Sequence, residues 1–132
     1  MTPLEGDMSG RIVHFEIPFD DGDRATNFYG TVFGWQAQPV PEMDYTMAMT
    51  GPVGDDGMPA EPGFINGGLF PRPKEAPNPT IYVGVQSVES AIKKVEAAGG
   101  KVITAKTPIP GMGAYARIAD TEGNVLGLFE GQ

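Results

Sequence analysis

RIVHFEIPFDDGDRATNFYGTVFGW, at residues 11–35, combines the signals of a β-strand and an amphipathic α-helix. In the strand part, residues 11–18, Val13, Phe15 and Ile17 lie on one face. His14 and Glu16 lie on the opposite face. This period of two predicts a strand with one buried face and one face that carries polar side chains.

The helix part begins at a cluster of aspartates and ends at Gly34. Asp20, Asp21 and Asp23 suit the first turn of a helix, because a carboxylate oxygen accepts hydrogen bonds from its unpaired N–H groups and complements the helix dipole. Between these ends, apolar residues recur at helical spacing and predict a single stripe that packs on a sheet. The stripe consists of Ala25, Phe28, Tyr29, Val32 and Phe33.

The same plan returns in TIYVGVQSVESAIKKVEAAGG, residues 80–100. Residue 80 follows residue 14 by 66 positions, half of the 132-residue chain. At this offset Thr80 corresponds to His14, and Tyr82 corresponds to Glu16. A repeat of this length indicates two copies of one structural unit. The apolar residues of the second strand and helix are Ile81, Val83, Val85, Val88, Ala91, Ile92 and Val95, and Ser87 is the expected helix cap.

Three shorter strands are predicted after each helix, so each half is expected to run strand, helix, strand, strand, strand. The predicted ranges are 35–40, 44–50, 64–70, 101–107, 114–120 and 125–130. GPVGDDGMPAEPG, at 51–63, is longer than most connections and is typical of a lid, a binding loop or a mobile segment. Residues 1–10 are polar and aperiodic, as in a loose leader.

The composition favours a single domain, residues 1–132, of the globular class, with 40% hydrophobic residues. No apolar run approaches the ~20 residues that a membrane span needs. The first residues lack both the basic start and the apolar core of a signal peptide. The absence of cysteine excludes disulfides and a thiolate nucleophile, and a net charge of −8 argues against nucleic acid as a partner. We therefore expect a cytoplasmic protein that binds neither membranes nor nucleic acids.

Several motifs resemble those of a known superfamily. HFEIP and NFYGTVFGW open the first half, YVGV and AAGG lie at the corresponding part of the second, and DTEGNVLGLFE closes the chain. Together with the tandem βαβββ order across residues 11–130, they make the chain similar to the vicinal oxygen chelate superfamily. That superfamily includes glyoxalase I, extradiol dioxygenases, and the bleomycin and fosfomycin resistance proteins.

The resemblance implies an α+β fold in which both units, about residues 11–70 and 79–130, form a U-shaped mixed sheet around a central cleft. The helices would cover the outer face, and the polar strand faces would line the cleft. A small organic molecule is the ligand that this cleft implies. The residues expected to bind it are Tyr45, Met47, Asn66, Thr80, Tyr82, Tyr115, Arg117 and Phe129.

Metalloenzymes of this superfamily hold a divalent ion with one ligand near the start of each unit and further ligands from later strands. Carried over to this sequence, the first position is His14, but the second is Thr80, where histidine is usual. The carboxylate position in the last strand, four residues after Gly123, is Gly127. Glu130 lies an odd number of residues further on and therefore on the other strand face. The resemblance thus predicts no metal ligand set and no cofactor.

Two function classes fit these residues. The first is a metal-independent binding protein of the antibiotic-resistance kind, which is the leading interpretation. The second is a glyoxalase-like lyase or isomerase in which His14 is a general base and Glu16 orients it. Purely structural roles are the alternative, with His14 hydrogen-bonded in place and Glu16 paired to Arg117 or to water. A homodimer is expected from the resemblance and from strand edges that need covering.

Overall fold

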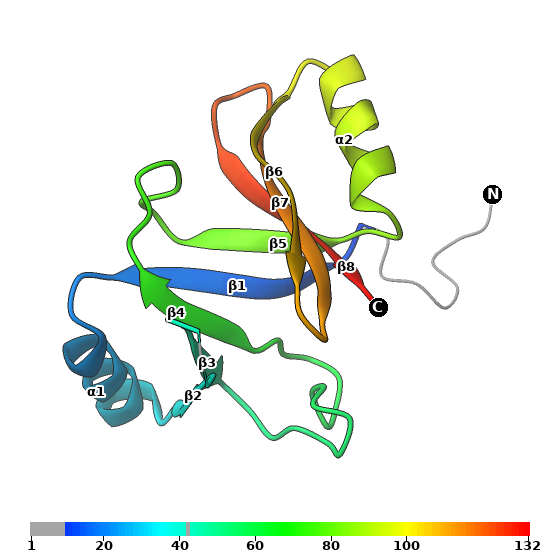
Figure 1. Cartoon of the computed structure of the whole chain (residues 1–132). Helices are drawn as coiled ribbons and strands as arrows, with labels where there is room; N and C mark the ends of the chain where they lie inside the picture. Colours follow the sequence, from blue (N-terminus) through cyan, green and yellow to red (C-terminus); the bar gives the residue numbers. More distant parts are fainter. Residues whose placement is uncertain (1–9, 42) are drawn as a thin grey trace. The chain divides into compact units, whose positions relative to one another are not determined.

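The computed structural model of the chain describes residues 10–41 and 43–132. All but the last residue of the predicted leader, residues 1–10, lies outside this range. The chain divides into two compact units: His14–Pro79, called the first unit, and Thr80–Gln132 with the segment that ends at Val13, called the second unit. Each half of the sequence has the predicted order of one strand, one helix and three strands (Figure 1).

The first half contains β1 (Ile12–Phe19), α1 (Gly22–Phe33), β2 (Gln36–Pro39), β3 (Thr46–Met49) and β4 (Gly67–Pro71). Their order in the sheet is β2–β3–β4–β1, in which β1 and β4 run parallel and the other neighbours run antiparallel. Asp21 caps α1 by accepting a hydrogen bond from the Arg24 N–H at 3.0 Å. Gly34 ends the helix with a φ of 75°, which glycine adopts readily.

The second half repeats this arrangement with β5 (Thr80–Gly84), α2 (Val88–Ala97), β6 (Lys101–Ile109), β7 (Gly113–Ala119) and β8 (Val125–Gly131). The strand order is β5–β8–β7–β6, and β5 and β8 are the parallel pair. Ser87 caps α2 by accepting from the Ser90 N–H at 3.1 Å, as predicted. The α+β class and the two βαβββ units are therefore confirmed.

The core of the second unit lies between α2 and the sheet. Val88 and Ala116 are fully buried there, next to Ile118 and Leu128. Partly buried residues of the predicted strand face and helix stripe pack around them, namely Val83, Val85, Ala91, Ile92, Val95 and Leu126. Ile81, which the alternation also assigns to this face, is 41% exposed.

The contacts of Glu130 agree with the prediction that its side chain lies on the other face of the last strand from position 127. Its carboxylate accepts a hydrogen bond from the Val88 N–H at 2.7 Å, in the first turn of α2. Lys106 Nζ lies 3.7 Å from carboxylate oxygens of both Glu130 and Glu89. Glu130 therefore stabilises the start of α2, where negative charge is favourable.

α1 differs from α2, because none of its residues is buried. Phe28, Val32 and Phe33 of the predicted stripe are more than half exposed. Of the predicted stripe, Tyr29 faces the sheet, together with Thr26, which the stripe did not include; both line a hollow that is also lined by residues of β3 and β4. A stripe of five apolar residues is wide enough to face the sheet in more than one rotation, so the spacing alone did not fix this contact.

The 51–63 segment forms a small hairpin in which Val53 and Pro59 make an isolated bridge. The Gly54 N–H donates to the Met58 carbonyl at 2.8 Å, and the Ala60 N–H donates to the Pro52 carbonyl at 2.9 Å. The long connection thus has internal backbone order. Neither described helix is long and apolar enough to span a membrane.

Candidate functional site

Each unit carries polar side chains on one face of its sheet. The first polar face is built around Gly68 of β4, which lies opposite Glu16 of β1 and opposite Met47 of β3. The second polar face is built around Gly127 of β8, which lies opposite Tyr82 of β5 and Arg117 of β7. Since Glu16 and Tyr82 are equivalent in the internal repeat, Gly68 and Gly127 are equivalent as well.

His14 and Tyr45 are joined on the first polar face. The His14 Nε2 atom lies 2.6 Å from Tyr45 Oη, and the two rings meet edge to face at 73°. Burial lowers the pKa of His14 below its ordinary value, and the charge of Glu16 opposes this shift. The imidazole is therefore neutral at pH 7, with one ring nitrogen as donor and the other as acceptor.

The lowered pKa of His14 predicts how stability depends on pH. An unfolded histidine titrates near 6.5, whereas the folded pKa is lower, so the folded state binds fewer protons over the interval between the two values. The free energy of unfolding therefore keeps its full value above pH 6.5. It falls as the pH drops from 6.5 through the folded pKa. Urea unfolding from about pH 7.5 to about pH 5 measures this loss.

His14→Gln is the control for this measurement, because His14 is the single histidine of the chain. The variant should show a flat profile across the window. Asp20 and Asp120 do not interfere, because hydrogen bonds lower the pKa of each below its ordinary 3.8. Parallel loss of stability in both proteins would show that His14 is not the group that titrates.

Tyrosine rings cover both central glycines. A Cβ built on Gly68 would lie 1.9 Å from Tyr45 Oη and 2.1 Å from its Cζ, so the phenol end of Tyr45 lies directly on the strand. A Cβ on Gly127 would lie 2.2 Å from both Cδ2 and Cε2 of Tyr82. Gly67, the neighbour of Gly68 in β4, is covered by a ring as well, because a Cβ there would lie 2.4 Å from Phe15 Cε1.

The second polar face combines a buried cation with aromatic rings. The Arg117 guanidinium carbon lies 5.3 Å from the ring centroid of Tyr115, in cation–π range. Tyr115 lies opposite Phe129 in the β7–β8 register. Thr80, Tyr82 and Arg117 are 3%, 3% and 7% exposed. The unit therefore holds a positive charge among aromatic groups, which suits an anionic ligand group.

Asn66 holds the hairpin that follows β3. Its Oδ1 accepts hydrogen bonds from the backbone N–H groups of Thr50 at 2.7 Å and Gly51 at 3.3 Å. Thr50 Oγ1 donates to the Ile65 carbonyl at 2.8 Å and so ties the same two segments together. The amide oxygen of Asn66 is thus part of the support of the 51–63 segment, a role that the sequence pattern did not indicate.

The predicted site residues are distributed over both units. His14, Glu16, Tyr45, Met47 and Asn66 belong to the first unit, and Thr80, Tyr82, Tyr115, Arg117 and Phe129 belong to the second. The sequence pattern did not indicate that tyrosine rings pack on the backbone at Gly68 and Gly127. The signal was present in the sequence as glycine at a strand position where a side chain would otherwise project.

The residues present do not fit the divalent metal that metalloenzymes of the resembled superfamily hold. Within residues 10–41 and 43–132, no three histidine, aspartate or glutamate side chains come together as metal ligands would. At Gly68 and Gly127, tyrosine rings take the space into which a ligand side chain would extend. Thr80 offers a neutral hydroxyl where imidazole would be needed.

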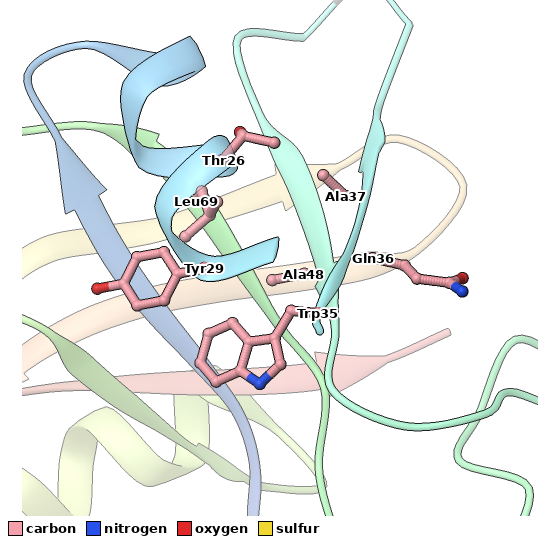
Figure 2. A pocket seen from close by; sticks show the side chains of 7 residues that line it. All are labelled: Thr26, Tyr29, Trp35, Gln36, Ala37, Ala48 and Leu69. Atoms are coloured by element: carbon pink, nitrogen blue, oxygen red, sulfur yellow. The ribbon is translucent and has the colours of Figure 1, made fainter. Parts of the chain in front are cut away.

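A hollow in the first unit lies between α1 and the strands β2 to β4. Its lining residues are Thr26, Tyr29, Trp35, Gln36, Ala37, Ala48 and Leu69 (Figure 2). The Tyr29 and Trp35 rings stack at a centroid distance of 5.0 Å beside it. Its volume of about 170 Å³, with open solvent included, is below the ~300–1,000 Å³ that is usual for ligand sites. This hollow is therefore too small for a typical small-molecule ligand.

Comparison with known proteins supports the resemblance. Residues 11–51 match the family model for the N-terminal part of bleomycin resistance protein-like domains. A glyoxylase-like domain-containing protein of Didymella fabae is 29% identical over 127 residues, which cover 89% of this chain and 91% of that protein. A probable chloroplastic lactoylglutathione lyase of Arabidopsis thaliana is 30% identical over 95 residues, which cover 70% of this chain but only 27% of that protein.

Solved structures share the fold at low sequence identity. Methylmalonyl-CoA epimerase of Mycobacterium tuberculosis is 15% identical, with 98% of this chain and 93% of that chain covered and a TM-score of 0.60. A hypothetical protein of Bacillus halodurans is 18% identical, with 94% and 96% covered and a TM-score of 0.63. The tandem βαβββ units, the sequence relatives and the family model together support the assignment to the vicinal oxygen chelate superfamily.

Proposed function

We propose that this protein binds a small organic molecule on its polar faces without a divalent metal ion. The observation that carries the proposal is the pair of glycines, Gly68 and Gly127, each covered by a tyrosine ring. Together these rings, the Arg117 cation and the Met47 side chain favour a mostly apolar molecule with an anionic or carbonyl group. The cleft expected between the two units and the homodimer remain predictions.

Metal analysis tests the first part of this proposal. Protein purified without an affinity tag and dialysed against a chelator should retain no stoichiometric metal, and its fold should be unchanged. Titration with zinc, nickel and manganese should give only weak binding, because His14 and Glu16 alone offer too few donors for a stable site. Stoichiometric metal that survives chelation and is lost in His14→Gln would contradict the proposal.

Identification of a retained ligand tests the second part. Native mass spectrometry of the freshly purified protein should detect a bound small molecule, which then disappears on denaturation. Several solved relatives are methylmalonyl-CoA epimerases, one of them in complex with methylmalonyl-CoA, so coenzyme A esters are a rational first set to add back. Protein that carries no retained molecule and binds none of a broad metabolite set would overturn the binding proposal.

A metal-independent lyase or isomerase is the second candidate, and the hydrogen bond between His14 and Tyr45 favours it. A neutral imidazole beside a phenol is chemically able to transfer a proton near pH 7. His14→Gln should then abolish turnover of the identified ligand while affinity and melting temperature stay close to those of the wild type. A large fall in melting temperature with unchanged turnover would return His14 to a structural role.

A further inference from the structure

We infer that the outer face of α1 is a docking surface for a second copy of this chain. This outer face consists of Phe28, Val32 and Phe33, which are 53%, 53% and 60% exposed. The sequence pattern turned these residues towards the sheet, and the homodimer expected from the resemblance had no helix face assigned to it. Neither the proposed ligand nor the polar faces enter this interface.

The second unit shows how the same surface looks when it faces solvent. At the 66-residue offset of the internal repeat, the outer face corresponds to exposed residues of the second half: Phe28 to Lys94, Val32 to Ala98 and Phe33 to Gly99. Lysine, alanine and glycine expose little apolar area to water, whereas two phenylalanines and a valine expose much more. The apolar surface is therefore specific to α1 and is not a general property of the repeated unit.

The exposed rings belong to one continuous aromatic cluster. Phe28 meets Phe33 edge to face at a centroid distance of 6.4 Å, and Phe33 lies 5.7 Å from Trp35. Tyr29 stacks on Trp35 at 5.0 Å, beside the hollow that both rings line (Figure 2). Because the rings already hold one another in place, docking orders few further side chains. Aromatic residues held in this way are typical anchors of protein interfaces.

The absence of charge around the outer face favours a second copy as the partner. Residues 25–41 contain no Asp, Glu, Lys or Arg, although the chain has a net charge of −8. Two acidic copies repel each other, so they meet most favourably where contact brings no like charges together. A basic partner would be matched by acidic side chains among the rings, and an acidic partner by basic ones. This segment has neither.

The neighbouring strand β2 extends the uncharged surface. All 4 of its residues are exposed, and it is the outermost strand of the first unit. The outermost strand of the second unit, β6, carries Lys101 and Lys106, and its pairing with β7 contains register shifts. Charges and bulges of this kind protect a sheet edge from association. The first unit thus lacks a protection that the equivalent edge of the second unit has.

The size of the surface predicts a weak, reversible dimer. An aromatic side chain offers about 150–250 Å², so the outer face leaves roughly 300 Å² of apolar surface open. Two such faces hide roughly 600 Å², and the exposed residues of β2 bring the total towards the ~1,000–1,200 Å² of the smaller specific interfaces. We therefore expect a twofold dimer, in which the same patch contacts itself, with a dissociation constant in the micromolar range.

Sedimentation velocity of the full chain, from about 1 to about 200 µM, should show this monomer–dimer equilibrium. Phe28→Lys introduces the residue that α2 has at the equivalent position. It should raise the dissociation constant about 10-fold or more, because both copies then bring a charge to the interface. Val32→Lys makes the same test at a position outside the ring cluster, and it stands even if Phe28→Lys disturbs packing. Met58→Lys is the matched control, because Met58 is 51% exposed in the 51–63 hairpin of the same unit, and it should dimerise as the wild type does.

Trp35, the single tryptophan of the chain, gives a readout specific to this surface. Its emission should move to shorter wavelength as the wild type and Met58→Lys dimerise. In Phe28→Lys and Val32→Lys this shift should appear only at about 10-fold higher concentration or more. Added salt should tighten the dimer, because screening weakens the repulsion between two chains of net charge −8.

Three results would overturn the inference. If the wild type stays monomeric throughout the concentration series, the outer face has another occupant. If Phe28→Lys and Val32→Lys dimerise with the affinity of the wild type, or if the dimer forms without a change in Trp35 emission, the copies meet at another surface. None of these results affects the proposed function, which is decided by the retained ligand in native mass spectrometry.

Discussion

Gly127→Ala should lower the free energy of unfolding by about 3 kcal/mol, at the upper end of the range for overpacked sites. The added Cβ would lie 2.2 Å from two ring carbons of Tyr82 and 2.6 Å from its Cγ. Cγ is close to the backbone, and Tyr82 is only 3% exposed, so the ring cannot move aside without rearrangement of β5 or β8. Urea unfolding followed by circular dichroism measures the change.

Two comparisons make this experiment specific. Gly30→Ala adds the same methyl group in α1, where its nearest neighbour would be the Trp35 carbonyl oxygen at 3.5 Å, and should stabilise the helix by about 0.5–1 kcal/mol. Gly127→Ala should also cost much less in a Tyr82→Ala background, because the clash is absent there. An equal cost in both backgrounds would show that contact with Tyr82 is not the cause.

The strands, helices and caps could be predicted because their signals are local. Asp21 and Ser87 accept hydrogen bonds from backbone N–H groups three residues further along the chain. Such contacts can therefore be predicted from a short stretch of sequence. Glu130 was placed on the opposite strand face from Gly127 because an odd number of residues separates the two, and its side chain contacts α2 on that face. The internal repeat then gave the order of elements in both units, because each half had to bury the same kinds of faces.

Contacts that cross several strands were not predictable in the same way. Tyr45 lies just before β3, and its place on Gly68 depends on the register between β3 and β4. The anchoring of the hairpin by Asn66 likewise joins segments about fifteen residues apart through one side-chain oxygen. Such contacts arise from pairing and twist of the whole sheet, which no short pattern encodes.

The contact between His14 and Tyr45 illustrates this difference. Alternation along β1 correctly put His14 on the polar face, but it could not show which side chain from another strand would reach its ring. The pairing gives the imidazole a hydrogen-bond partner from another part of the chain, so the two side chains form one polar group on this face. The site is therefore defined by side chains from neighbouring strands more than by any linear motif.

Arg117→Met should weaken binding of an anionic ligand by about 10–100-fold, as is typical for loss of a hydrogen-bonded charge at a buried site. Arg117 is 7% exposed and lies opposite Gly127, with the Tyr82 ring on the same glycine and the Tyr115 ring beneath the guanidinium. A cation held in such surroundings is screened little by water, so it discriminates strongly by charge. Methionine keeps the length and apolar volume of the side chain and removes the charge.

The measurement compares each carboxylate ligand with its neutral amide, by calorimetric titration of both proteins. The amide should lose little affinity in Arg117→Met, since it shares the apolar contacts but not the charge. Arg72→Met is the matched control, because Arg72 is exposed and pairs with Asp20 in the first unit at 2.9 Å, and this variant should leave both affinities unchanged. Equal weakening of the carboxylate and the amide by Arg117→Met would mean that Arg117 shapes the site without reading charge, and the anionic ligand class would then be wrong.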